Sequence, residues 1–272
     1  MIRQVGACTW IFGDMSLDQI IGRLASLGYS GIELTGDWNR YPHQLILKII
    51  KDYNFKIFSL TPANVDLAHP EAKVRQEAIA YYLELLNYAD KIGAPIVTCH
   101  GKVGRIQPLT SQEEEEEFFL EAVAKIAMTA QKLGIKLALE GLNRYESHLL
   151  NSAVQILALI EQIKSPALGL LLDTYHMNIE EPDLAMAIKT AGDKLFLVHL
   201  ADSNRRAPGR GHIPFAQLFL ALDEINYDGP LIIECSAPGP DPFTPIKGIG
   251  WEEAVWDEVA AAAAFLKKYS IL

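Results

Sequence analysis

The chain has 272 residues, half of them hydrophobic, and a formal net charge of −10. This length suits one large α/β barrel or two small domains, and the apolar fraction is ample for a sizeable core. The acidic balance disfavours proteins that wrap nucleic acid or dock on an anionic membrane, although it allows a small polar substrate. We therefore expect neither a nucleic-acid partner nor a membrane partner.

The cysteines and the N-terminal segment help to predict the cellular compartment. Cys8, Cys99 and Cys235 lie in or beside apolar runs, without C-x-x-C spacing, and their odd number argues against a disulfide framework. We expect three buried free thiols. The N-terminus lacks the apolar stretch of a signal peptide, and no apolar run approaches the ~18 residues of a membrane span. These features predict a cytoplasmic protein.

Short β-rich runs alternate with longer amphipathic runs along the whole chain, which is typical of βα units around a parallel sheet. Strands are predicted at 4–9, 31–34, 55–60, 95–100, 135–140, 168–173, 195–200 and 231–235. Helices are predicted at 17–27, 44–53, 71–92, from a cap at Thr110 with Glu113 completing a capping box, near 149–163, after Pro182, near 215–225 and at 251–269. Eight such units without a composition break predict one (β/α)₈ TIM-barrel domain over residues 1–272.

Four of the predicted strands carry a metal-binding side chain at or near their last residue. These side chains are Glu140, Asp173, His199 and Glu234. In a closed barrel the ends of successive strands converge on the axis, so the four groups are expected to meet. Three carboxylates and one imidazole suit Mn²⁺, Mg²⁺ or Co²⁺ better than a structural zinc ion. A purely structural network is the alternative, but ionised groups packed together need a compensating charge.

The segments around these strand ends resemble a known family. LALEGLNRYE (137–146), DTYHMNIEE (173–181) and HLADSNRRAPGRGHIPF (199–215) closely resemble the ketose 3-epimerases, and the similarity extends to Glu234. That family includes the D-tagatose and D-psicose 3-epimerases and belongs to the xylose-isomerase-like TIM barrels. The resemblance covers roughly the C-terminal half, while the N-terminal half matches mainly in its alternation of strands and helices.

The resemblance implies a metal-dependent epimerase that inverts the carbon next to the carbonyl group of a ketose. The metal would be one divalent ion per subunit, Mn²⁺ in the first place, bound by Glu140, Asp173, His199 and Glu234. Glu140 and Glu234 would also be the acid–base pair, and Glu146, His176 and Arg205 would hold the carbonyl end of the sugar. Chemically, two carboxylates flanking an enediolate can remove and return a proton while a cation stabilises the oxyanion. The resemblance also suggests a homodimer or a homotetramer.

The sequence departs from the family after the fourth predicted strand, where TCHGKVGRIQP has no aromatic residue. Lys102 and Arg105 in that stretch either meet an anionic substrate group or are solvated loop charges. Trp10 and Phe12 are expected to supply one apolar wall of the site. The proline- and glycine-rich stretch after the eighth strand is expected to form a lid. Glu33, at the end of the second strand, either serves the site, as a supporting residue or as a substrate contact, or caps a helix.

Three other functions stay open at this point. An aldose–ketose isomerase, acting on hydroxypyruvate or a sugar phosphate, would use the same site and move hydrogen between carbons 1 and 2. A metal-dependent abasic-site endonuclease shares the barrel type, but the acidic charge and the missing D-x-H motif after the seventh strand weigh against it. A non-enzymatic sugar-binding barrel would leave the paired carboxylates without a role.

Overall fold

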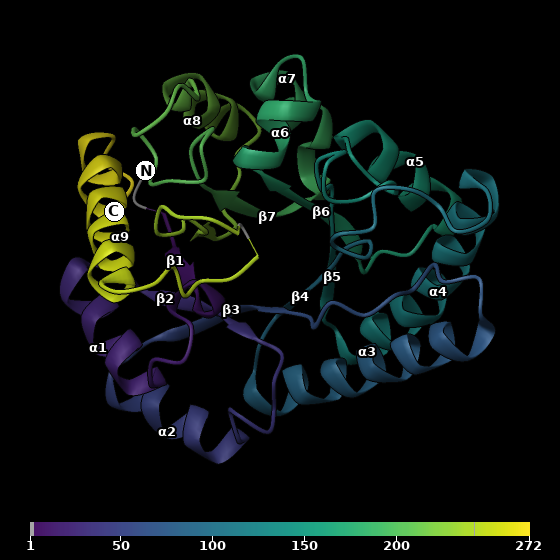
Figure 1. Cartoon of the computed structure of the whole chain (residues 1–272), viewed down its shortest axis with the longest axis horizontal. Coiled ribbons are helices and arrows are strands. Elements are labelled where there is room, and N and C mark those ends of the chain that lie inside the picture. The colour runs from purple at the N-terminus through teal and green to yellow at the C-terminus, as the bar shows by residue number, and fades with distance from the viewer. Residues whose placement is uncertain (1–2, 242) are drawn as a thin grey trace.

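The structure, a computed structural model, describes residues 3–241 and 243–272. Eight parallel strands follow one another around a closed barrel, and the last strand pairs with the first (Figure 1). They are β1 (Val5–Cys8), β2 (Gly31–Thr35), β3 (Lys56–Thr61), β4 (Ile96–Cys99), β5 (Lys136–Glu140), β6 (Leu168–Asp173), β7 (Leu195–Leu200) and β8 (Leu231–Ile233). The predicted (β/α)₈ TIM-barrel fold is therefore confirmed.

Helices surround the barrel on the outside (Figure 1). They are α1 (Leu17–Leu27), α2 (His43–Asp52), α3 (Ala72–Ile92), α4 (Gln112–Leu133), α5 (Ala153–Ile163), α6 (Thr174–Glu180), α7 (Leu184–Ala191), α8 (Phe215–Glu224) and α9 (Trp251–Lys268). Two short 3₁₀ helices, η1 (Thr9–Phe12) and η2 (Gly192–Lys194), accompany them. None of the helices in the described ranges is both long and apolar enough to cross a membrane.

The helix predictions are wrong in three places. Helix α4 is capped by Ser111 rather than Thr110, because the Ser111 side chain accepts the backbone N–H of Glu114. Helix α5 begins at Ala153 rather than near residue 149, because Ser152 forms the capping box there. Two helices, α6 and α7, lie between β6 and β7 where one was predicted. The extra helix follows β6 without a loop, so no turn signal marked its start.

The strands are buried on both faces, as expected for a parallel barrel covered by helices. All six residues of β6 are buried, for example, and so are all four of β1. The three cysteines are buried and free, as predicted. Close packing between neighbouring strands requires glycine at some positions: Gly6 and Gly31 face each other across β1 and β2, and the ring of Phe58 on β3 lies against both.

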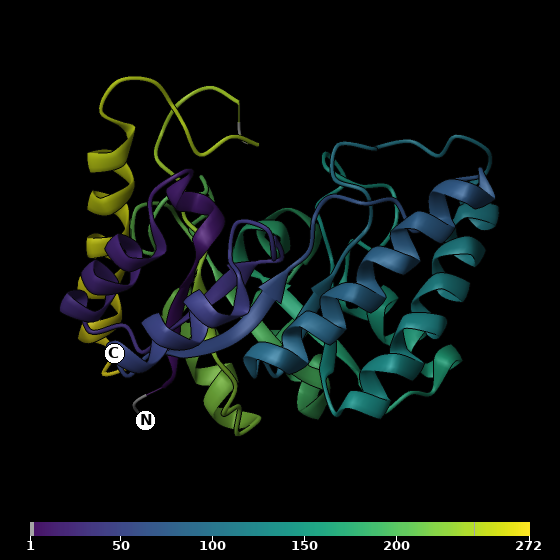
Figure 2. The same ribbon diagram turned by 90° about the horizontal axis from the view of Figure 1, so that it is seen from below.

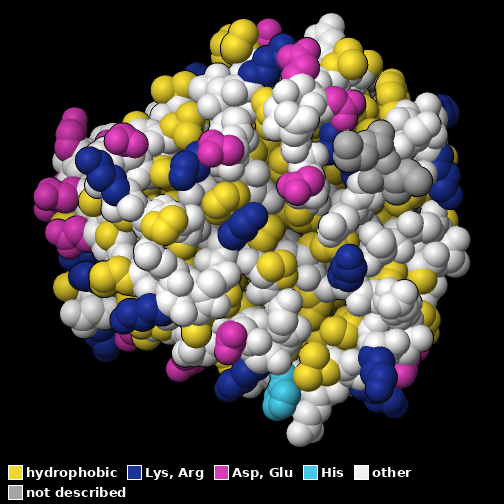
Figure 3. Space-filling view, turned by 180° about the vertical axis from the view of Figure 1, so that it is seen from behind, with side chains coloured by type: hydrophobic (Ala, Val, Ile, Leu, Met, Phe, Trp, Pro, Cys, Tyr) yellow, Lys and Arg dark blue, Asp and Glu magenta, His cyan; other side chains and the backbone are white. Residues whose placement is uncertain are grey.

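The loops that follow the strands define the functional end of the barrel. The loop between β4 and α4 and the loop between β8 and α9 rise on the same side of the molecule (Figure 2). The chain ends meet on the other side, where the backbone N–H of Arg3 donates to the carbonyl oxygen of Ile271 at 2.9 Å. Seen from behind, that side has charged and apolar side chains interspersed (Figure 3).

We predict that Gly31→Ala destabilises the barrel. An added Cβ would lie 2.3 Å from the ring of the buried Phe58 and 2.7 Å from the carbonyl oxygen of Lys56. Overpacking of this kind costs about 1–3 kcal/mol, so the melting temperature should fall by about 2–12 °C. Gly22→Ala in α1 is the matched control, because its Cβ would meet only the exposed end of Tyr53. Its melting temperature should stay level or rise, since alanine favours helix; equal melting temperatures for all three proteins would contradict the packing argument.

Candidate active site

Four side chains meet where strands β5 to β8 end. Glu140 and Asp173 are the last residues of β5 and β6, His199 is the penultimate residue of β7, and Glu234 directly follows β8. One potential ligand atom from each lies within 4.8 Å of the others, and all four side chains are buried. The closed barrel thus brings the predicted group together, whereas its role as a ligand set stays a prediction.

Negative charge exceeds positive charge in this group. Glu33 of β2 adds a fourth buried carboxylate, with Oε2 3.1 Å from Nε2 of His199. The positive partners are His199, when protonated, and Arg205, whose Nη2 lies 3.3 Å from Oε2 of Glu234. Four buried carboxylates cannot all be ionised next to two cations without a large desolvation penalty. Protonation or a bound cation must supply the difference.

The pKa values of the carboxyl groups reflect this imbalance. Burial raises the pKa of Glu140 well above its usual range, and the carboxylates of Glu234, Asp173 and Glu33 raise it further against the opposing effect of His199. Burial, followed by the charge of Glu234, raises the pKa of Asp173 to about 7. Burial would also raise the pKa of Glu234, but His199 and Arg205 outweigh it and hold that pKa below its usual range. Without a further positive charge, protons therefore remain on part of the cluster.

The donor set fits a divalent cation. Oδ2 of Asp173 is buried and accepts no hydrogen bond within the described ranges 3–241 and 243–272. A buried carboxylate oxygen with a vacant lone pair is uncommon and calls for an explanation such as an ion. Three carboxylates and one imidazole are ligands typical of Mn²⁺, Mg²⁺ or Co²⁺ sites. The residues present could therefore hold such an ion, and its charge would balance the cluster.

Arg205 reaches the cluster from the loop between β7 and α8. Its backbone lies in the left-handed region, with φ 59°, which is uncommon for residues other than glycine. Its Nη1 lies 3.8 Å from Oδ2 of Asp173, and its Cζ is 4.7 Å from the centre of the Tyr175 ring. The charges of Glu234 and Asp173 outweigh burial and raise the pKa of Arg205, so its guanidinium stays charged.

Asp202 shapes the loop that carries Arg205, and sequence reasoning missed it. Its buried carboxylate accepts the backbone N–H groups of Ser203, Gly209 and Ile213 at 2.8, 2.8 and 3.1 Å. Its carbonyl oxygen also accepts the backbone N–H of Arg205 at 2.8 Å. Asp202 lies within the segment that resembles the ketose 3-epimerases. That resemblance could have drawn attention to the residue, but it gave no indication that its carboxylate holds the loop.

His176 and Glu146 lie beside the cluster and are connected by Asn143, a second residue that sequence reasoning missed. The side-chain amide of Asn143 donates to Nδ1 of His176 at 2.8 Å and to Oε1 of Glu146 at 3.0 Å. Nε2 of His176 then faces Oδ2 of Asp173 at 3.5 Å. Burial and the charge of Arg205 lower the pKa of His176 well below its usual range, so this imidazole is neutral.

A cavity of about 210 Å³ connects these groups. Six of the seven predicted site residues line it: Glu140, Glu146, His176, His199, Arg205 and Glu234. The seventh, Asp173, lies behind the lining, with 1% of its surface exposed. Trp10 lines the cavity and donates its indole N–H to Oε1 of Glu234 at 2.8 Å. His100, which follows β4, and Phe243, from the loop after β8, also line the cavity.

Several loop residues lie elsewhere than expected. Phe12 is buried against Trp256, with ring centres 4.5 Å apart, and does not line the cavity. Arg105 is neither a substrate contact nor a solvated charge, because it pairs with Asp66 at 2.8 Å and with Glu115. Lys102 donates to the carbonyl oxygen of Asn64 at 2.6 Å. Both cations therefore fasten the loop after β4 to the rest of the protein.

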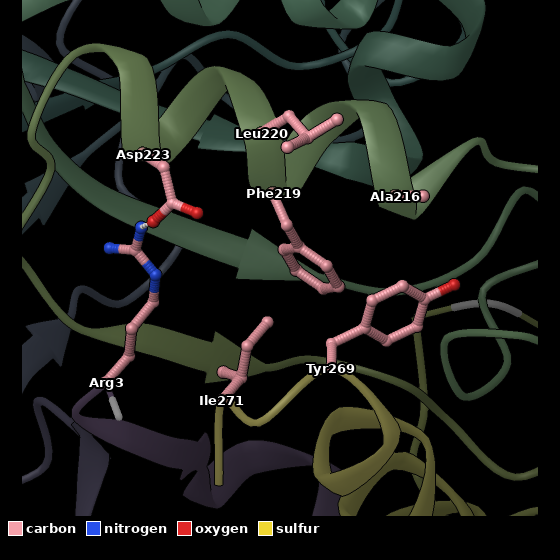
Figure 4. Close-up of a pocket in the computed structure, with 7 residues that line it drawn as sticks. All are labelled: Arg3, Ala216, Phe219, Leu220, Asp223, Tyr269 and Ile271. Carbon is pink, nitrogen blue, oxygen red and sulfur yellow. Dashed lines mark hydrogen bonds and ion pairs between the residues drawn. The ribbon is translucent and has the colours of Figure 1, made fainter. Parts of the chain in front are cut away.

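A second hollow, of about 300 Å³, lies outside the barrel between α8 and the C-terminal residues (Figure 4). Phe219, Tyr269 and Ile271 form its apolar part, and Asp223 is its acid. That acid already pairs with Arg3 at 2.6 Å. The hollow therefore offers no group of free polar side chains comparable with those at the strand ends.

Known proteins match the chain over most of its length. The family described as xylose isomerase-like TIM barrel matches residues 21–268. A D-psicose 3-epimerase of Agrobacterium fabrum is 32% identical over 259 residues, which cover 91% of this chain and 86% of the relative. A D-psicose 3-epimerase of Ruminiclostridium cellulolyticum is 31% identical over 74% of this chain and 68% of the relative.

Solved structures agree with the sequence matches. A D-allulose 3-epimerase from Methylomonas sp., in complex with D-allulose, superimposes with a TM-score of 0.86 at 27% identity, covering 98% of this chain and 97% of that chain. Family, relatives and structural neighbours thus agree with one another. The chain belongs to the xylose isomerase-like TIM barrel family, in the group of its ketose 3-epimerase relatives.

Proposed function

We propose that the protein is a metal-dependent ketose 3-epimerase. The observation that carries this proposal is the pair of buried carboxylates, Glu140 and Glu234, which line one cavity from strands separated by β6 and β7. An epimerase must take a proton from one face of a carbon and deliver one to the other face. Two carboxylates held on different strands suit that task, and the relatives' names agree with it.

In the proposed reaction, one of the two carboxylates removes the proton from carbon 3 and the other returns a proton to the opposite face. A divalent cation held by Glu140, Asp173, His199 and Glu234 would stabilise, as a Lewis acid, the negative charge that develops on the carbonyl oxygen. Arg205 and the N–H of His176 would donate hydrogen bonds to the same end of the sugar, and Glu146 would accept one from a hydroxyl group.

The cavity favours an unphosphorylated sugar. Among the described residues that line it, Arg205 is the permanently charged cation, and it already faces Asp173 and Glu234. Lys102 and Arg105, the other candidate phosphate contacts, are bound to Asn64 and Asp66 in the loop after β3. A phosphate group would thus bring more negative charge to an acidic site, which disfavours the sugar-phosphate isomerase.

The ion, the compartment and the assembly of the protein complete the proposal. We propose Mn²⁺ as the native ion, with Mg²⁺ or Co²⁺ as alternatives, because the ligand set is rich in oxygen. The whole chain is proposed to form one domain in the cytoplasm and, by analogy with the family, to assemble as a homodimer or homotetramer.

The reaction products test the proposed activity directly. Mn²⁺-loaded protein, incubated in deuterated water with D-fructose, D-psicose, D-tagatose or L-ribulose, should convert at least one of them to its carbon-3 epimer. Deuterium should appear at carbon 3, because the proton that returns comes from solvent-exchanged carboxyl groups. Product analysis by chromatography and NMR measures both. Deuterium at carbon 1 or 2 would indicate aldose–ketose isomerisation, and no reaction with any of the four sugars would refute the proposal.

Substitution of each carboxylate in turn tests the two-base mechanism. Glu140→Gln and Glu234→Gln should each lower kcat by about 10²–10⁴-fold, the usual contribution of a general acid or base. Each variant keeps one base, so each should still exchange the carbon-3 proton of one epimer with solvent, and the two variants should prefer opposite epimers. Isotope exchange into recovered substrate measures this. Glu115→Gln is the control, since Glu115 is a buried acid outside the cavity. Normal turnover in either Glu140→Gln or Glu234→Gln would contradict the two-base mechanism.

Metal binding can be tested without turnover, by measuring thermal stability. Protein stripped with a chelator should be inactive, and Mn²⁺ at a hundred times its Kd should stabilise the fold by about 2.7 kcal/mol. That gain corresponds to a rise of about 5–11 °C in melting temperature. Asp173→Asn should lose the rise because it removes a ligand oxygen without touching the acid–base pair. An unchanged melting temperature with excess Mn²⁺ in the wild-type protein would argue against the site.

A further inference from the structure

We propose that Glu33 is a positioning residue for the metal site: its carboxylate accepts the Nε2–H of His199 and so leaves the Nδ1 lone pair facing the other ligands. This inference rests on the metal site of the proposed function. It assigns a role to a residue that is outside the ligand set and outside the cavity lining.

The two ring nitrogens of His199 face different neighbours. Nε2 lies 3.1 Å from Oε2 of Glu33 on β2, across the barrel. Nδ1 lies 3.2 Å from Oε2 of Glu234 and 3.8 Å from Oε1 of Glu140, on the side of the ligand group. A neutral imidazole donates from one nitrogen and offers a lone pair on the other. Carboxylates face both nitrogens, but Glu234 belongs to the ligand group and Glu33 does not. When Glu234 binds the ion, the carboxylate that remains at Nε2 selects the tautomer whose free lone pair is on Nδ1.

Glu33 is itself held in one orientation. Its side chain is fully buried, and each of its oxygens accepts a hydroxyl group from β3: Ser59 donates to Oε2 at 2.6 Å and Thr61 donates to Oε1 at 2.5 Å. Ser59 is the residue paired with Glu33 in the sheet, so the contact follows from strand register. The carboxylate therefore cannot turn away from His199 without breaking two further hydrogen bonds.

The geometry decides among the roles that the sequence left open for Glu33. The residue lies inside β2, and the hydrogen bonds of its side chain go to β3 and β7, so it caps no helix. It is absent from the cavity lining, so it supports the site from behind. In metal sites, a carboxylate on the distal nitrogen of a histidine fixes the ring and raises the basicity of the ligating nitrogen.

The test is Mn²⁺ affinity, measured by calorimetry on chelator-treated protein. Glu33→Gln should weaken binding by about 10- to 100-fold, the usual effect of losing such a partner, because an amide is a weaker acceptor and can turn its NH₂ group toward Nε2. The matched control is Glu115→Gln, a buried acid paired with Arg105, which should bind Mn²⁺ like the wild type. Equal affinity of Glu33→Gln and the wild type would overturn the inference.

A second measurement locates the imidazole proton in the wild-type protein itself. In wild-type protein with ¹⁵N-labelled histidine and bound Mg²⁺, the NMR signals of His199, assigned by their loss in His199→Gln, should show the proton on Nε2. A proton on Nδ1 would overturn the inference even if the variant binds metal poorly. Failure of the wild type to bind either ion would instead remove the metal site itself, so the two failures are distinguishable.

Discussion

The excess of buried negative charge at the centre of the barrel is the constraint on which the site depends. Glu33, Glu140, Asp173 and Glu234 are all buried within one group, and burial of even one unpaired carboxylate is costly. The strands fix the positions of the carboxylates before any ligand binds, so the carboxylates cannot move apart to lower this cost. A divalent cation is the simplest compensation, since it binds the same oxygens whose crowding raises the pKa values of Glu140 and Asp173. The instability of the unfilled cluster is therefore also a source of metal affinity.

The proposed metal ligands and the rest of the cavity wall come from different parts of the fold. The proposed ligands lie on strands or directly after one, where the barrel holds them on several sides. The proposed sugar contacts and the outer wall come instead from segments that follow the strands: Trp10 from η1, Arg205 from the loop after β7 and Phe243 from the loop after β8. Such segments can change without disturbing the sheet. Changes in these segments would therefore alter the proposed sugar contacts without moving the proposed metal ligands.

The sequence predicted most of what depends on local pattern. Apolar runs located every strand to within about two residues, the usual uncertainty of element boundaries, and an acid or imidazole at four successive strand ends identified the central group. What could not be predicted depends on contacts between distant strands. The role of Glu33 needed the pairing of β2 with β3 and the distance across the barrel to His199. Likewise, nothing near Phe12 indicated that its ring packs on Trp256, more than 240 residues later.

Three arginines in the loop between β7 and α8 show how backbone conformation directs neighbouring side chains to different places. Arg206 and Arg210 both reach the buried carboxylate of Glu258 on α9 and fasten the loop to the helix layer. Arg205, next to Arg206 in sequence, lies instead beside Asp173 and Glu234 in the cavity. Its left-handed backbone costs about 1–3 kcal/mol in a residue with a side chain. The hydrogen bonds of Asp202 and the two ion pairs with Glu258 offset that strain, so the loop can hold one guanidinium inward while its neighbours point out.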